Sequence, residues 1–110
     1  MRLFAGQSAW VVQRLTALLL LLLLLLAVVN VLLRPPGFAA WRELATSTHG
    51  AVLIIVGYLA LALHAWIGAR DVVLDYVHHA GLRLAILGIV AVLLAGVLVR
   101  TVLTLAAAAA

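Results

Sequence analysis

The apolar run from Leu15 to Leu33, which contains nine consecutive leucines from Leu18 to Leu26, limits the fold of this chain more than any other feature. At about 1.5 Å per residue, a helix of this length crosses a hydrocarbon core about 30 Å thick. Hydrophobic residues make up 69% of the 110 residues and charged residues only 9%, whereas about a quarter of a soluble domain is charged. These features predict an integral membrane protein. The run is longer than the apolar core of a secretory signal and lacks a small-residue cleavage site after it, so we expect a retained span.

The same reasoning predicts three membrane-spanning helices at about residues 10–33, 48–69 and 82–105, within one all-α membrane-anchor domain over residues 1–110. Pro35-Pro36-Gly37 is expected to end the first span. The most polar stretch, from Arg70 to Arg83, is expected to form the loop between the second and third spans. The alanine tail at 106–110 carries no interpretable signal.

The charged residues indicate membrane anchoring rather than nucleic-acid binding. All seven basic residues are arginines placed singly near the ends of apolar runs, with no basic stripe for phosphates. Three spans would place four arginines with the N-terminus and three on the other side, which weakly favours a cytoplasmic N-terminus. The first group is Arg2, Arg14, Arg70 and Arg83, and the second is Arg34, Arg42 and Arg100. Cysteine is absent, so this chain offers no thiolate for a metal or an iron–sulfur cluster.

His64 lies inside the second predicted span, where an ionisable residue is rare and usually functional. Gly50, Gly57, Ala60 and Gly68 share its helical face, so a broad, flat group such as a haem could approach the backbone there. Packing of another helix against these small residues, with a neutral histidine bonded across the bundle, is the alternative. We favour haem ligation by His64.

A six-coordinate haem would need a second ligand from another chain. His49 is fifteen residues from His64 on the same helix, about 22 Å away, so the two cannot share one iron. His78 and His79 lie beyond the membrane end, and the first and third spans contain no His, Cys, Lys or Met. The small-residue faces at Gly57, Gly68, Gly88 and Gly96 are likewise expected to need neighbouring helices or haem.

The stretch His64-Ala65-Trp66-Ile67-Gly68, followed by Asp75-Tyr76 eleven residues after the histidine and then by Leu82-Arg83-Leu84, resembles the small hydrophobic anchor subunit of bacterial succinate dehydrogenase (complex II) of the cytochrome b556 type. Trp41 and the segment Gln13-Arg14-Leu15-Thr16 also match the pattern of that family. The resemblance covers most of the chain, but its specific part is about 20 residues long, from His64 to Arg83. His78 and His79 depart from the family pattern, and we expect them to be solvated; contact with the iron–sulfur subunit is the alternative.

The resemblance implies a role in electron transport and the tricarboxylic acid cycle. It implies that His64 is an axial ligand of haem b, shared with the larger hydrophobic anchor subunit, and that Tyr76 donates a hydrogen bond to ubiquinone or menaquinone. Asp75 is expected to assist at the quinone site, Arg14 to pair with a haem propionate, and Arg70 and Asp71 to form a solvated interfacial pair. The iron–sulfur and flavoprotein subunits would carry out succinate oxidation, so this chain is expected to hold no catalytic residue. The expected location is the bacterial cytoplasmic (inner) membrane.

Two other functions fit part of the sequence. The anchor of a fumarate reductase, or a menaquinone-linked relative, would have the same features, because the reaction direction depends on the quinone and the soluble subunits. A small proton-coupled transporter of similar length fits less well, since it needs four spans and a carboxylate within the membrane. The acidic residues here are Glu43, Asp71 and Asp75, all predicted in loops.

Overall fold

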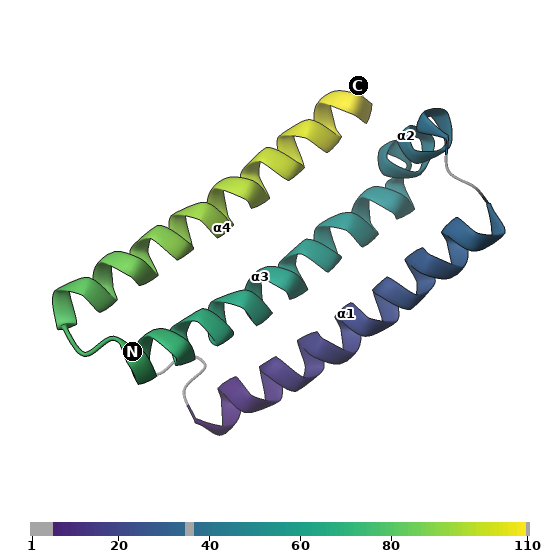
Figure 1. Cartoon of the computed structure of the whole chain (residues 1–110). Coiled ribbons are helices and arrows are strands. Elements are labelled where there is room, and N and C mark those ends of the chain that lie inside the picture. The colour runs from purple at the N-terminus through teal and green to yellow at the C-terminus, as the bar shows by residue number, and fades with distance from the viewer. Residues whose placement is uncertain (1–5, 35–36, 110) are drawn as a thin grey trace.

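The computed structural model describes residues 6–34 and 37–109, which form four helices (Figure 1). They are α1 (Gln7–Leu33), α2 (Phe38–Thr46), α3 (Thr48–Tyr76) and α4 (Ala80–Ala109), and no strand occurs in these residues. Helices α1, α3 and α4 are each long and apolar enough to cross a membrane. The prediction of an all-α protein with three membrane spans is confirmed. Arg2 and the expected helix terminator Pro35-Pro36 lie outside the described residues.

Helix α3 is longer than the sequence pattern predicted, because it continues past Ala69 to Tyr76. The expected loop from Arg70 to Arg83 therefore shrinks to residues 77–79. No glycine or proline interrupts residues 70–76, and a helix keeps its backbone hydrogen bonds when it leaves the hydrocarbon. The prediction was wrong here because the end of an apolar run marks the membrane boundary and not the helix end. Similarly, the expected loop after the first span contains the short helix α2.

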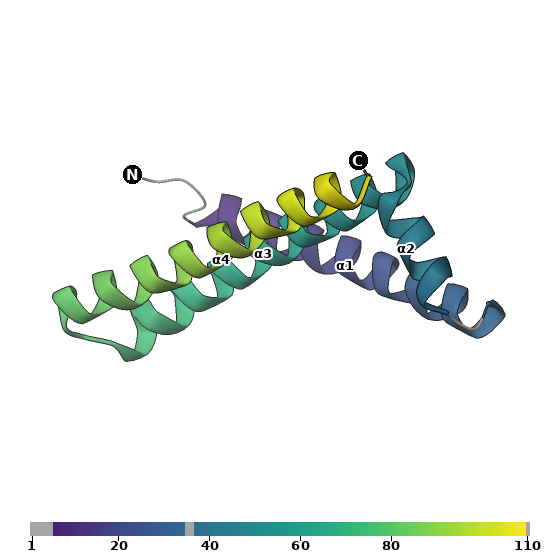
Figure 2. The same cartoon turned by 90° about the horizontal axis from the view of Figure 1, so that it is seen from above.

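Helix α3 lies between α1 and α4 and runs antiparallel to both (Figures 1 and 2). Within the described residues α1 and α4 do not contact each other, and α2 packs against α3 and α4. The start of α1, the end of α3 and the start of α4 lie at the same end of the molecule, which we call the Tyr76 end. The opposite end, where α2 lies, is the α2 end.

A tight turn at the α2 end sets the start of α3. The Ser47 hydroxyl donates to the Leu44 carbonyl at 2.7 Å and accepts from the Gly50 amide at 3.0 Å, so Ser47 caps the helix. A Cβ atom on Gly50 would lie 1.7 Å from the Leu44 carbonyl oxygen. Only glycine fits at this position, because the backbone leaving α2 passes directly over it.

The small-residue face of α3 packs against helices of this same chain. A Cβ on Gly57 would lie 3.3 Å from a Leu23 side-chain carbon, and one on Gly68 would lie 3.7 Å from the Gln13 amide nitrogen. Part of this face is therefore covered by α1, and haem binding beside His64 stays a prediction. The small residues let α1 approach α3 closely, as in other membrane helix pairs.

The outer surface of α4 is open. None of its described residues is buried, and a Cβ added at Gly88 or Gly96 would meet nothing within 4 Å. Gly57 and Gly68 are thus covered by the neighbouring helix α1, whereas the face at Gly88 and Gly96 is open in this chain.

Candidate functional site

His64 lies on the part of α3 that faces α1, about three turns before the helix ends. Its Nδ1 atom is 3.1 Å from the Oγ1 atom of Thr16 on α1. Thr16 is 7% exposed and His64 is half-buried. The Nε2 atom has no hydrogen bond among the described residues and is not enclosed by them. One ring nitrogen is thus held inside the chain, and the other is available to a ligand from outside it.

The surroundings of His64 combine apolar packing with two polar side chains of α1. Ile67, one turn along α3, is 1% exposed. Gln13 lies one turn before Thr16 and approaches Gly68, and its Oε1 atom is buried with no hydrogen-bond partner among the described residues. The residue pattern of α1 alone gave Thr16 and Gln13 no role beyond the entry to a membrane span. Their significance follows from the antiparallel register of α1 and α3.

Asp75 and Tyr76 lie at the end of the same helix as His64 but differ in direction. At about 100° per residue, Asp75 is rotated about 20° from His64 and Tyr76 about 120°. Tyr76 is 78% exposed, and its hydroxyl has no hydrogen bond within the described residues. Along the continuous helix, Tyr76 is about 18 Å from His64. The fold therefore places Asp75 and Tyr76 at the Tyr76 end of α3. It does not bring Tyr76 into contact with His64.

Arg14 does not lie beside His64. It is two residues before Thr16, about 200° around α1, and so occupies a different face of that helix. Its guanidinium carbon lies 5.3 Å from the centre of the Trp10 ring, a cation–π arrangement typical of a membrane interface. The role of Arg14 toward a haem propionate stays a prediction.

Hydrogen bonds from α4 hold the short connection at the Tyr76 end. The Arg83 guanidinium donates to the Val77 carbonyl and, at 3.0 Å, to the Leu74 carbonyl. These carbonyls lie at the end of α3. The last carbonyls of a helix have no amide donor within it, and a positive charge is favourable there. The sequence singled out Arg83 only through its place in a family pattern, and the capping role requires the fold.

Two further polar contacts lie nearby. The Nδ1 atom of His79 accepts from the Leu82 amide at 3.1 Å, so His79 caps the start of α4 instead of being only solvated. His78 is exposed. The Arg70 guanidinium lies 3.1 Å from the Asp71 carboxylate, which confirms the predicted pairing, but the Arg70 side chain is 19% exposed and so is only partly solvated.

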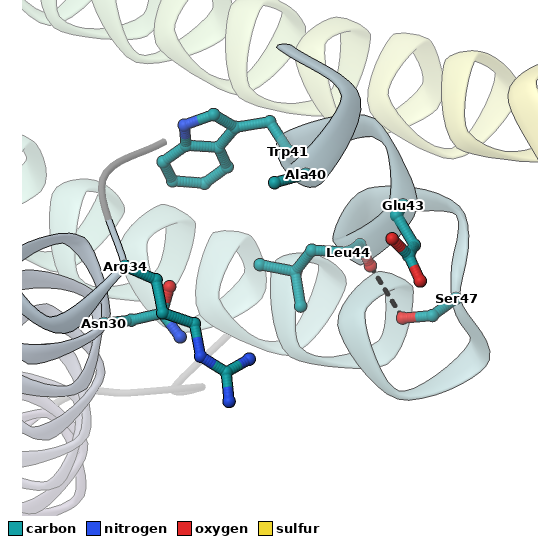
Figure 3. Close-up of a pocket in the computed structure, with 7 residues that line it drawn as sticks. All are labelled: Asn30, Arg34, Ala40, Trp41, Glu43, Leu44 and Ser47. Atoms are coloured by element: carbon teal, nitrogen blue, oxygen red, sulfur yellow. Dashed lines mark hydrogen bonds between the residues drawn. The ribbon is translucent and has the colours of Figure 1, made fainter. Parts of the chain in front are cut away.

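A separate cavity of about 320 Å³ lies at the α2 end, far from His64 and Tyr76 in the sequence and in the fold (Figure 3). The side chains of Arg34 and Glu43 lie on opposite sides of it, and Trp41 covers it from α2. None of the predicted site residues lines this cavity. Within residues 6–34 and 37–109, no group of three or more His, Cys, Asp or Glu side chains is arranged to hold a metal ion.

Comparison with known proteins gives two matches. The family model for the succinate dehydrogenase/fumarate reductase transmembrane subunit matches residues 1–104. The succinate dehydrogenase hydrophobic membrane anchor subunit of Coxiella burnetii is 32% identical over 92 residues, which cover 83% of this chain and 80% of the relative. No solved structure matches the chain at a significant level.

Proposed function

Because the chain belongs to the family of succinate dehydrogenase/fumarate reductase transmembrane subunits, we propose that it helps a succinate:quinone oxidoreductase to bind haem b and quinone in the bacterial cytoplasmic membrane. The observation that carries the proposal is His64, a histidine inside an apolar helix with one ring nitrogen bonded to Thr16 and the other unpartnered. The N-terminus is proposed to face the cytoplasm, on the same side as the Tyr76 end.

The residues around His64 fit a haem that is shared with a second chain. Neutral imidazole is a common axial ligand, and His64 lies within an apolar helix, one turn from the buried Ile67. When bound, haem b supplies a one-electron carrier within the membrane. His64 would hold the iron from one side, and a histidine of the larger anchor subunit would complete the pair. Arg14, on another face of α1, is proposed to neutralise a propionate.

Tyr76 and Asp75 are proposed to contact the quinone at the same end of the molecule. Quinone reduction requires two electrons and two protons, and charge develops on a carbonyl oxygen during the reaction. A phenol hydroxyl remains a hydrogen-bond donor at physiological pH and stabilises such a charge. The exposed Tyr76 hydroxyl leaves its donor free for a group outside this chain. Asp75, also exposed, would orient polar groups around the site.

The succinate-oxidising chemistry is assigned to partner subunits that carry flavin and iron–sulfur clusters. A larger hydrophobic anchor subunit would cover the open surface of α4 or the Nε2 side of His64. The description of the matching family includes fumarate reductase, so an anchor that works in the opposite direction, or with menaquinone, is the second candidate.

The haem proposal is tested by replacing His64 with Ala in the assembled complex and recording the reduced-minus-oxidised spectrum. His49→Ala is the matched control, because His49 lies exposed on the same helix at the α2 end. We expect His64→Ala to lose or alter the b-type spectrum and His49→Ala to keep it. A normal haem content with unchanged spectrum in His64→Ala would refute ligation by His64.

A further inference from the structure

Thr16 is the one polar residue that is buried among the described residues, and it contacts His64 from within an apolar span. Its Oγ1 atom is 2.8 Å from the Val12 carbonyl oxygen, 3.2 Å from the Gln13 carbonyl oxygen and 3.1 Å from the Nδ1 atom of His64. Three polar atoms therefore surround one hydroxyl group. Their donor and acceptor capacities decide the protonation pattern of the cluster.

A threonine hydroxyl has a single proton, and a carbonyl oxygen can only accept. If the proton pointed to His64, two bare oxygens would face each other at 2.8 Å between Thr16 and Val12. The proton therefore goes to the carbonyl of Val12, in the bond that threonine commonly makes to the preceding helical turn. The remaining lone pairs of Oγ1 then face Nδ1, so Nδ1 must be the donor.

A neutral imidazole with its proton on Nδ1 carries its lone pair on Nε2. This is the ring nitrogen that has no partner among the described residues and is not enclosed by them. We infer that Thr16 is a positioning residue that fixes the tautomer and ring orientation of His64, so that Nε2 is presented as the axial ligand of the haem. The inference rests on the proposed function and adds a residue from α1 to it.

The packing of α1 against α3 holds this bond in place. The contacts of Leu23 with Gly57 and of Gln13 with Gly68 lie on either side of the Thr16–His64 pair. Together they fix the antiparallel register that brings the hydroxyl to the ring. A 180° flip of the ring would put the Cδ2 carbon in the place of Nδ1, facing Thr16, and would lose the present hydrogen bond. Partners of this kind also raise the basicity of the ligating nitrogen, and their loss typically weakens metal binding by about 10-fold to 100-fold.

The test uses the assembled complex with three substitutions at Thr16. Thr16→Val removes the hydroxyl at nearly constant shape, Thr16→Ala removes it with loss of volume, and Thr16→Ser keeps it. The readouts are haem content, the electron paramagnetic resonance spectrum of the ferric haem and its midpoint potential. Loss of the bond makes His64 a weaker electron donor to ferric iron, so the potential should rise. If the site's preference for ferric over ferrous haem falls tenfold, the midpoint potential of this one-electron couple rises by about 59 mV.

We expect Thr16→Val and Thr16→Ala to share the raised potential and an altered ferric spectrum, and Thr16→Ser to resemble the unmodified complex. Unchanged potentials in both hydroxyl-free variants would overturn the inference. A shift in Thr16→Ala alone, or an equal shift in Thr16→Ser, would assign the effect to packing and would also overturn the inference. If His64→Ala keeps a normally ligated haem, the proposed function itself fails, whatever the Thr16 variants show.

Discussion

Removal of the Tyr76 hydroxyl, in the variant Tyr76→Phe, separates quinone chemistry from the stability of this chain. Tyr76 is 78% exposed at the last residue of α3, and its hydroxyl has no hydrogen bond within the described residues. The substitution therefore breaks no hydrogen bond within the described part of the chain and keeps the ring. Any defect should arise from a group that binds Tyr76 from outside, which we propose to be a quinone carbonyl.

The magnitude follows from one lost hydrogen bond. Leaving a buried acceptor without its donor costs about 1–3 kcal/mol, which is roughly a tenfold to hundredfold change in rate. The charge on the carbonyl grows as the quinone is reduced, so the donor is worth more in the transition state than in the bound quinone. We therefore expect the turnover number for quinone reduction to fall at least as much as the apparent quinone affinity.

The assay measures succinate oxidation twice, with a quinone and with an artificial acceptor that takes electrons from the soluble subunits. Only the quinone-linked activity should fall in Tyr76→Phe. Tyr58→Phe is the matched control, because the Tyr58 hydroxyl donates to the Leu94 carbonyl at 2.8 Å and links α3 to α4. That variant should cost about 0.5–1.5 kcal/mol of stability and keep both activities once assembled. Full quinone reductase activity in Tyr76→Phe, or an equal fall of both activities, would refute the assignment.

Two other substitutions test the parts of the fold that position the site. Gly50→Ala should destabilise the complex by about 1–3 kcal/mol, because the added Cβ would collide with the Leu44 carbonyl. This loss is expected even though alanine normally favours a helix over glycine. An unchanged melting temperature would contradict this packing. Arg83→Gln should speed hydrogen exchange at the end of α3 and weaken quinone binding with haem retained, because the Leu74 and Val77 carbonyls lose a charged donor. Exchange at the unmodified rate would show that Arg83 does not hold this turn.

The sequence by itself determined the membrane class and the number of spans. Apolar runs of about 20 residues can satisfy their backbone in lipid only as helices, so their lengths are sufficient evidence. The sequence also singled out His64, because ionisable residues are rare within membrane-spanning apolar runs. The pairing of Arg70 with Asp71 could also be predicted from the sequence, since the two residues are adjacent in the chain.

The end of α3 and the use of its small-residue face depended on the tertiary structure. Hydropathy reports where the lipid ends, and a helix can continue beyond that point, as α3 does to Tyr76. The sequence pattern did not show what lies against Gly57 and Gly68, and only the docking of α1 placed Leu23 and Gln13 beside them.

The Thr16–His64 hydrogen bond is the feature that depends most clearly on the tertiary structure. The two residues are 48 positions apart, and in the leucine-rich α1 no periodicity marks the face that turns toward α3. Which residue of α1 reaches His64 is set by the register and crossing of two helices, and therefore by packing over their whole length. The sequence alone identified the histidine, whereas the tertiary structure showed which of its two nitrogens lies against Thr16.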